Sequence, residues 1–331
     1  MMNMTPPTYK ASAAAHWGSA GLGRVRRRRL AAWAAAMALL GWALMIIGAF
    51  VRASESGLGC PDWPACHGQL VAGGHHAMIE EFHRWVTTVL VVGVVGLAAM
   101  VFRGYRHERR LTRPVVWMLA MLALQVVLGG MTVLLRNVAW TVVAHYGGAA
   151  LLVGSITLVA VRLAFPAAEP APHDSFSRLV GWFVALSFGL LLAGSTLANA
   201  GSDSACGHGY PLCNGSLFPS LNHLVVIALV HRVWAGALLV LAVWVLLRSR
   251  RDRAGAAPIR WAAVVVLILY CVLAGLGFVI VGVSDSSATE VLHSSVASLT
   301  WVALATLLWL TRTLATPQRT NPSQSGIPAV P

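Results

Sequence analysis

Eight long apolar segments constrain the fold of this 331-residue chain more than any other feature. A helix rises about 1.5 Å per residue, so about 20 apolar residues cross the roughly 30 Å hydrocarbon core of a bilayer. We therefore expect an all-α integral membrane protein with eight transmembrane helices. The predicted spans are 31–52, 82–102, 114–135, 138–162, 178–199, 223–247, 261–282 and 289–311.

The composition favours lipid over water as the main solvent. Hydrophobic residues make up 57% of the chain and charged residues 11%, whereas a soluble domain carries about 25% charged residues. In a soluble protein the net charge of +13 would indicate a nucleic-acid partner. Here the arginines lie in short clusters between apolar spans, a pattern typical of membrane topology. We expect membrane lipid and no nucleic acid among the partners.

The distribution of Lys and Arg predicts the orientation in the membrane. The basic residues are concentrated before the first span, in alternate loops and after the last span. By the positive-inside rule these segments are cytoplasmic, so both termini are expected inside a multi-pass protein of the cell (inner) membrane. The exceptions, expected at the outer ends of helices, are Arg52, Arg84, Arg136 and Arg232.

The two halves of the chain repeat one design. His83 and His145 lie 62 residues apart, as do His231 and His293, and the second pair follows the first at an offset of 148. This repeat predicts two pseudo-symmetric four-helix bundles. The expected parts are a basic cytoplasmic tail (1–30), an N-terminal bundle (31–164), a cytoplasmic linker (165–177), a C-terminal bundle (178–313) and a cytoplasmic tail (314–331). The residues before 30 and after 315 are expected to be disordered.

These four histidines are candidate haem ligands. Each lies in the first turns of a span that runs from outside to inside, within roughly 15 Å of the outer boundary. An ionisable side chain in a span is costly and points to function, although a single one can simply bond to a neighbouring helix. Two imidazoles per bundle do not fill a four-ligand zinc site, but they supply the two axial ligands of an iron porphyrin. We expect one bis-histidine haem site in each half.

A carboxylate distinguishes the halves. Glu80 stands three residues before His83, whereas the matching position before His231 is Ala228. Residues three apart share a helix face, so Glu80 is expected near the haem that His83 binds. It could carry a proton or stabilise a developing cation; the alternative is an acid favoured by the helix dipole. We assign chemistry to the N-terminal half and electron transfer to the C-terminal half.

Two arginines and two cysteine pairs flank the histidines. Arg84 and Arg232 directly follow a histidine and are candidate contacts for haem propionates, or else anchors of the helix end. The cysteine pairs Cys60–Cys66 and Cys206–Cys213 lie in outer loops, at spacings that suit local disulfides. A zinc site of four cysteines and a redox role are the alternatives. No role is assigned to the outer histidines His67, His75, His76, His208 and His223.

Five segments of the chain resemble the haem A synthase family. They are GAFVRASESGLGCPDWPACHGQ after the first span, EEFHRW, VVAHYGGAALL, ALVHRVWAGALL and EVLHSS. The resemblance covers about 30–315 and implies eight helices in two four-helix bundles. It also implies oxidation of the C8 methyl group of haem O to the formyl group of haem A, with molecular oxygen as co-substrate, in the maturation of cytochrome oxidase.

The resemblance also implies roles for individual residues. His83 and His145 would ligate the substrate or product haem, His231 and His293 would hold haem b, and Glu80 would be required for turnover. The loop cysteines match the subgroup that forms a disulfide in each half. A haem O synthase and an electron donor are the expected partners, and the oligomeric state is open. The alternatives are a dihaem b-type electron carrier, which needs haems on both sides of the membrane, and a haem transporter.

Overall fold

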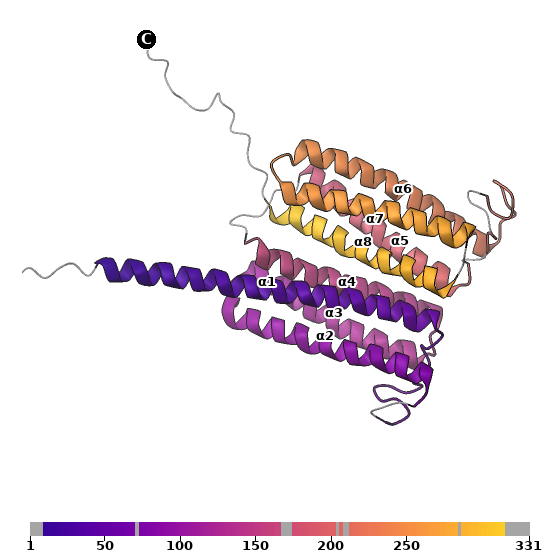
Figure 1. The fold of residues 1–331 in the computed structure, drawn as a ribbon, viewed down its shortest axis with the longest axis horizontal. Coiled ribbons are helices and arrows are strands. Elements are labelled where there is room, and N and C mark those ends of the chain that lie inside the picture. The colour runs from indigo at the N-terminus through magenta and orange to yellow at the C-terminus, as the bar shows by residue number, and fades with distance from the viewer. Residues whose placement is uncertain are drawn as a thin grey trace, which may run out of the picture.

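In the computed structural model, the described residues form α-helices joined by loops (Figure 1). Those residues are 9–69, 73–166, 174–202, 205–207, 212–283 and 286–314. Eight helices are each long and apolar enough to cross a membrane, which confirms the predicted number of spans. They are α1 (Tyr9–Ala53), α2 (His75–Tyr105), α3 (Arg109–Leu134), α4 (Ala139–Ala164), α5 (Ser175–Asn199), α6 (His223–Asp252), α7 (Ala257–Gly282) and α8 (Ser287–Thr313).

Two helices begin earlier than hydropathy predicts. The prediction of disorder before residue 30 is wrong from Tyr9 onward, because α1 begins there and continues through the basic segment. Alanine and arginine, which dominate this segment, are both strong helix formers. Helix α2 begins at His75 rather than at 82, since its first turns carry polar residues that an apolar pattern cannot reveal. His83 therefore lies deeper inside its helix than the sequence indicates.

Within each half the helices pack in a ring. In the first half the adjacent pairs are α1–α2, α2–α3, α3–α4 and α4–α1; in the second they are α5–α6, α6–α7, α7–α8 and α8–α5. Over the described residues, α2 and α4 have no close backbone contact, and neither have α6 and α8. The histidine-bearing helices thus face each other diagonally across each ring. Internal symmetry beyond this packing order stays a prediction.

The halves meet along α1 and α4 on one side and α5 and α8 on the other (Figure 1). Helix α4 lies at the centre of this contact and is the most buried span. The Trp301 indole of α8 donates a hydrogen bond to the Ala150 carbonyl of α4 at 2.6 Å. The Trp42 indole of α1 donates to the Ser295 carbonyl of α8 at 3.1 Å. Side chains of both halves therefore bind the backbone of the other.

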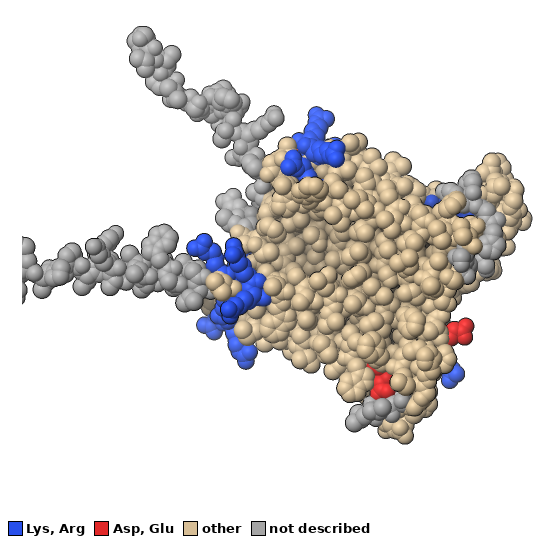
Figure 2. Space-filling view, in the orientation of Figure 1, with Lys and Arg blue, Asp and Glu red and all other residues tan. Residues whose placement is uncertain are grey.

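A group of Lys and Arg side chains lies at one end of the molecule (Figure 2), the end at which α1 continues beyond the other helices (Figure 1). Arg27 forms a two-pronged ion pair with Glu108, at 2.9 and 3.0 Å. It also donates to the carbonyls of Arg162 and Leu163 at the C-terminus of α4, at 3.1 and 3.3 Å. The cation thus satisfies carbonyls that a helix end leaves unpaired.

Candidate functional site

The four predicted ligand histidines lie at the opposite end of the molecule from this basic cluster. Consecutive helices alternate in direction, so α2, α4, α6 and α8 all begin at the same end. Each carries its histidine in the second or third turn, about 9–12 Å from the helix start. The residues are His83 in α2, His145 in α4, His231 in α6 and His293 in α8.

The structure brings the histidines of each half together. His145 lies within electrostatic reach of His83, and His231 lies within electrostatic reach of His293. Because the two helices of a pair face each other diagonally, their imidazoles approach from opposite sides of the ring of helices. Each half therefore offers two ring nitrogens across its interior, the arrangement that two axial ligands of one planar group require.

A glycine lies beside each of these imidazoles on the preceding helix. A Cβ added at Gly129 or Gly194 would stand 3.1 Å from the Cε1 of the adjacent histidine, closer than ordinary contact, and the other two glycines would be at 3.5 and 3.8 Å. Small residues thus let each ring lie close against a neighbouring backbone. The glycine–histidine pairs are Gly48–His83, Gly129–His145, Gly194–His231 and Gly277–His293.

The donor set fits haem better than a structural metal. The Nδ1 atoms of His83, His231 and His293 are buried without a hydrogen-bond partner in the described part of the chain. Buried polar atoms in native proteins are normally paired, so an imidazole left unpaired is one that a ligand can complete. Within the same residues, no three His, Cys, Asp or Glu side chains cluster as a metal site would need. Two-nitrogen coordination of iron in a porphyrin is the chemistry that these side chains allow.

His145 differs from the other three. The Gln125 side-chain nitrogen, from α3, lies 3.0 Å from Nδ1 and 3.4 Å from Nε2 of its ring. The same amide donates to the His145 carbonyl at 3.0 Å. The sequence prediction missed Gln125, although an amide is an unusual residue in an apolar span and was a signal that could have been used.

A disulfide loop lies at the histidine-bearing end of each half. The pairs Cys60–Cys66 and Cys206–Cys213 are both disulfide-bonded, as predicted. This excludes the alternative of one zinc site made by four thiolates. In both loops the backbone of the second cysteine also pairs, in the antiparallel β manner, with the backbone of the residue three positions later. Each loop is therefore a closed turn pinned next to the first histidine-bearing helix of its half.

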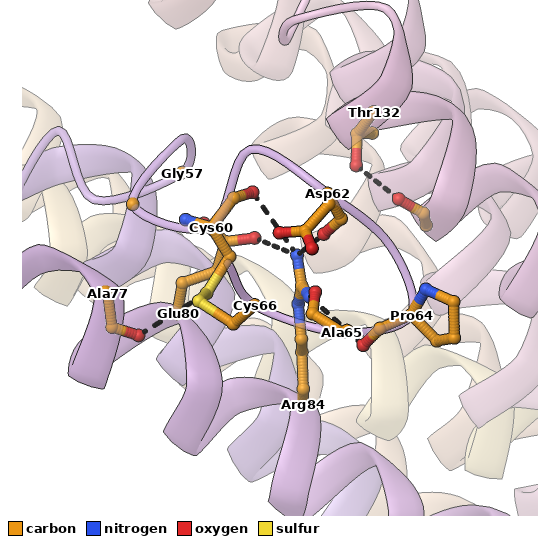
Figure 3. A network of polar contacts seen from close by, with 12 residues as sticks. Gly57, Cys60, Asp62, Pro64, Ala65, Cys66, Ala77, Glu80, Arg84 and Thr132 are labelled. Carbon is orange, nitrogen blue, oxygen red and sulfur yellow. Dashed lines mark hydrogen bonds and ion pairs between the residues drawn. A yellow bond between two sulfur atoms is a disulfide. The ribbon is translucent and has the colours of Figure 1, made fainter. Parts of the chain in front are cut away.

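Arg84 anchors the first loop (Figure 3). Its guanidinium donates to the carbonyls of Ala65 at 2.6 Å, Asp62 at 3.0 Å and Pro64 at 3.2 Å. It also pairs with Glu80 at 2.7 Å. A planar guanidinium is suited to several fixed acceptors at once, which a lysine ammonium does not match.

Arg232 repeats one of these contacts in the second half. It donates to the carbonyl of Leu212, 20 residues earlier, at 3.3 Å. Arg84 likewise donates to the carbonyl of Pro64, 20 residues earlier. The repeat thus extends to the attachment of the loops. These partners were not predictable from the sequence, and contact of either arginine with a haem propionate stays a prediction.

Glu80 lies buried between α2 and the first loop, with 5% of its surface exposed (Figure 3). One carboxylate oxygen accepts the Cys60 backbone N–H at 2.9 Å, and the other accepts from Arg84 at 2.7 Å. In the second half Ala228 occupies the equivalent position and is also buried. The carboxylate is therefore fixed by the loop, one turn of α2 away from His83.

Asp62 shapes the tip of the first loop. Its carboxylate accepts the backbone N–H groups of Gly68 at 2.8 Å and of His67 at 2.6 Å. The bond from Gly68, more than any other, holds the pKa of Asp62 below its usual value. Both donors have a positive φ, so the aspartate supports a turn that Gly68 adopts freely and His67 does not.

The remaining described histidines at this end contribute to the first loop or begin a helix. His67 contacts the Gly59 carbonyl through Nε2 at 3.1 Å, and His76 contacts the Ser56 hydroxyl through Nδ1 at 2.9 Å. His75 and His223 are the first residues of α2 and α6. His208 lies outside the described residues.

Comparison with known proteins gives a consistent result. The sequence model of the COX15-CtaA family, described as cytochrome oxidase assembly protein, matches residues 31–82, 74–157 and 135–305. The haem A synthase of Symbiobacterium thermophilum is 30% identical over 299 residues, covering 83% of this chain and 94% of that protein. The haem A synthase of Halalkalibacterium halodurans is 25% identical over 275 residues, covering 81% and 92%. That of Mesorhizobium japonicum is 26% identical over 294 residues, covering 74% and 80%.

Proposed function

The chain belongs to the COX15-CtaA family of cytochrome oxidase assembly proteins, and from that premise we propose that it is a haem A synthase. It is then an oxidoreductase that converts the C8 methyl group of haem O to the formyl group of haem A, with molecular oxygen as co-substrate. The observation that supports this most is that the family match spans both histidine pairs, together with haem A synthases that align over most of the chain.

In this proposal the two histidine pairs bind different haems. His83 and His145, in the N-terminal bundle (31–164), hold the substrate or product haem; His231 and His293, in the C-terminal bundle (178–313), hold haem b. When bound, the first iron supplies oxygen chemistry and the second supplies electrons. The diagonal placement of each pair and the glycine beside each ring support this assignment.

Glu80 is the proposed catalytic carboxylate. Its two oxygens are held by the Cys60 N–H and the Arg84 guanidinium, so the group is oriented before substrate arrives. An oriented carboxylate beside a substrate ring can stabilise developing positive charge or accept a proton at its oxygen. The loop that carries Cys60 covers this position and limits the access of water. Ala228 offers no such group in the second half.

The main alternative is a dihaem b-type electron carrier across the membrane. Such a carrier needs one haem near each face, so that an electron crosses the bilayer. All four candidate ligands lie at the same end of the molecule, opposite the arginine cluster. The arrangement therefore favours the synthase over the carrier.

We also propose the orientation and the partners. With the arginine-rich end cytoplasmic, both termini lie inside the cell and both haem sites lie near the outer face. A haem O synthase would supply the substrate through the membrane, and a separate donor would supply electrons to haem b.

Pigment analysis tests the proposed function. The protein is expressed in cells that make haem O but lack their own haem A synthase, and the haems of the purified protein are extracted and separated. We expect haem b together with haem O, haem A or the intermediate alcohol, and haem A in the membranes. Haem b alone, in cells that contain haem O, would contradict the proposal.

A further inference from the structure

Gln125 is the only described side chain that reaches the ring nitrogens of His145 by a hydrogen-bond contact in this structure. Its amide nitrogen lies 3.0 Å from Nδ1, 3.4 Å from Nε2 and 3.0 Å from the carbonyl of the same histidine. Iron binds imidazole through a ring nitrogen whose lone pair is free. An amide N–H that donates to Nδ1 uses the lone pair of that nitrogen and leaves the ring proton on Nε2, so in this arrangement neither nitrogen of His145 has a lone pair free for iron.

The second half lacks this arrangement at the equivalent positions. At the offset of 148 residues, Leu273 replaces Gln125 and Val296 replaces Gly148. The glycine matters because a Cβ there would stand 2.5 Å from the Gln125 carbonyl oxygen, so the amide fits only where a side chain is missing. An apolar leucine cannot bond to an imidazole. Consistent with this, the Nδ1 atom of His293 has no partner in the described part of the chain.

The difference matches a difference in task, and here the argument rests on the proposed function. A substrate haem must enter and leave its site in every catalytic cycle, whereas an electron-transferring haem b stays bound. A side chain that competes for one axial ligand weakens ligation and offers the freed imidazole a hydrogen bond, which lowers the cost of release.

We propose that Gln125 is a positioning residue that competes with haem iron for His145 and so makes the haem of the N-terminal half exchangeable. When haem is bound, the amide gives up at least one ring nitrogen; when haem leaves, the amide returns. Within the described residues His231 and His293 have no such competitor, so the haem of the C-terminal half stays bound.

The test measures haem release from the purified, haem-loaded protein. An excess of a haem-free soluble globin captures what is released, and the haems left in the membrane protein are extracted and separated over time. In Gln125→Leu, which copies the second half, loss of haem O and haem A should slow several-fold, while loss of haem b should not change. The low-spin spectrum of the first haem should also become insensitive to added imidazole.

A second variant distinguishes loss of the amide contact from a packing defect at residue 125. Gly148→Ala leaves Gln125 in place but displaces the flexible end of its side chain, so it should slow release in the same way. The matched control, Leu273→Gln with Val296→Gly, builds the same competitor beside His293 and should accelerate the loss of haem b. Unchanged or faster loss of haem O and haem A in both first-half variants would overturn the inference. Wild-type protein without either haem would instead overturn the proposed function, and the inference with it.

Discussion

Glu80 and Ala228 occupy equivalent positions in the two halves, three residues before a ligand histidine, and both are buried. A buried carboxylate is costly unless it is paired, and Glu80 has both a cationic and a backbone donor. An acid chosen only for the helix dipole would not need two such partners. This pairing favours function over the helix-end explanation that the sequence left open.

The first prediction concerns Glu80→Gln. The amide retains the size of the side chain but loses the negative charge, so we expect haem b and haem O to stay bound while haem A formation falls by about a hundredfold or more. Extracted haems from matched cultures provide the measurement. Glu81→Gln, one residue along the same helix, is the control and should convert haem O normally. Normal haem A yield from Glu80→Gln would exclude the assigned role.

The second prediction concerns Arg84→Lys. Lysine cannot serve three carbonyls and a carboxylate together, so Arg84→Lys should release the first loop and lower the free energy of unfolding by about 2–3 kcal/mol. It should also reduce haem A formation, because Glu80 loses its cation. Thermal denaturation gives the measurement; unchanged stability of Arg84→Lys would contradict the role of Arg84 as an anchor.

At the scale of helices and loops, the sequence predicts what depends on apolar length. All eight spans appear, since twenty consecutive apolar residues leave a chain few alternatives in lipid. The early starts of α1 and α2 were not predictable this way, because their first turns are held by helix propensity and loop contacts rather than by hydropathy. The disulfides were predictable from spacing. The carbonyls that Arg84 binds were not, since they depend on the path of the loop.

The start of α5 gives a third prediction, which depends on pH. Asp174 caps this helix by accepting the Ser177 N–H at 2.8 Å and also pairs with the buried Arg253. Burial acts to raise the pKa of Asp174, but these two hydrogen bonds outweigh it and hold the pKa below its usual 3.8. Because folding lowers the pKa of Asp174, the pair stabilises the protein fully at pH values above the unfolded-state pKa. This stabilisation is lost as the pH falls through the folded-state pKa.

Two substitutions separate the cap from the ion pair. Asn caps helices as well as Asp does, so Asp174→Asn should lose only the partner of Arg253, and its stability should vary less between pH 3 and pH 5, a range of roughly one unit on each side of the usual pKa. Asp174→Ala should lose about 1 kcal/mol more, because the cap is lost as well. Thermal midpoints across this range give the measurement. An unchanged pH dependence in Asp174→Asn would show that Arg253 does not depend on this carboxylate.

At the scale of the whole molecule, the repeat predicts which histidines pair, because one offset of 148 residues relates both pairs. The contact between the halves could not be predicted. Trp42 and Trp301 fit equally well as lipid-facing aromatic residues, and only the packing shows that their indoles bind backbone carbonyls across the interface. An ion pair joins Arg52 of α1 to Glu290 of α8 at 2.6 Å at the same end as the histidines. These contacts fix the distance over which an electron would pass between the two proposed haems.

The measurement that tests the account most directly is the haem content of two paired variants. In His83→Ala/His145→Ala we expect loss of haem O and haem A with haem b retained. In His231→Ala/His293→Ala we expect loss of haem b with haem O retained and not converted, and the remaining haem in each variant still low-spin by electron paramagnetic resonance. Such reciprocal loss is predicted only if each half binds one haem between its own two imidazoles. Retention of both haems in either variant, or loss of both in each while the protein stays folded, would contradict it.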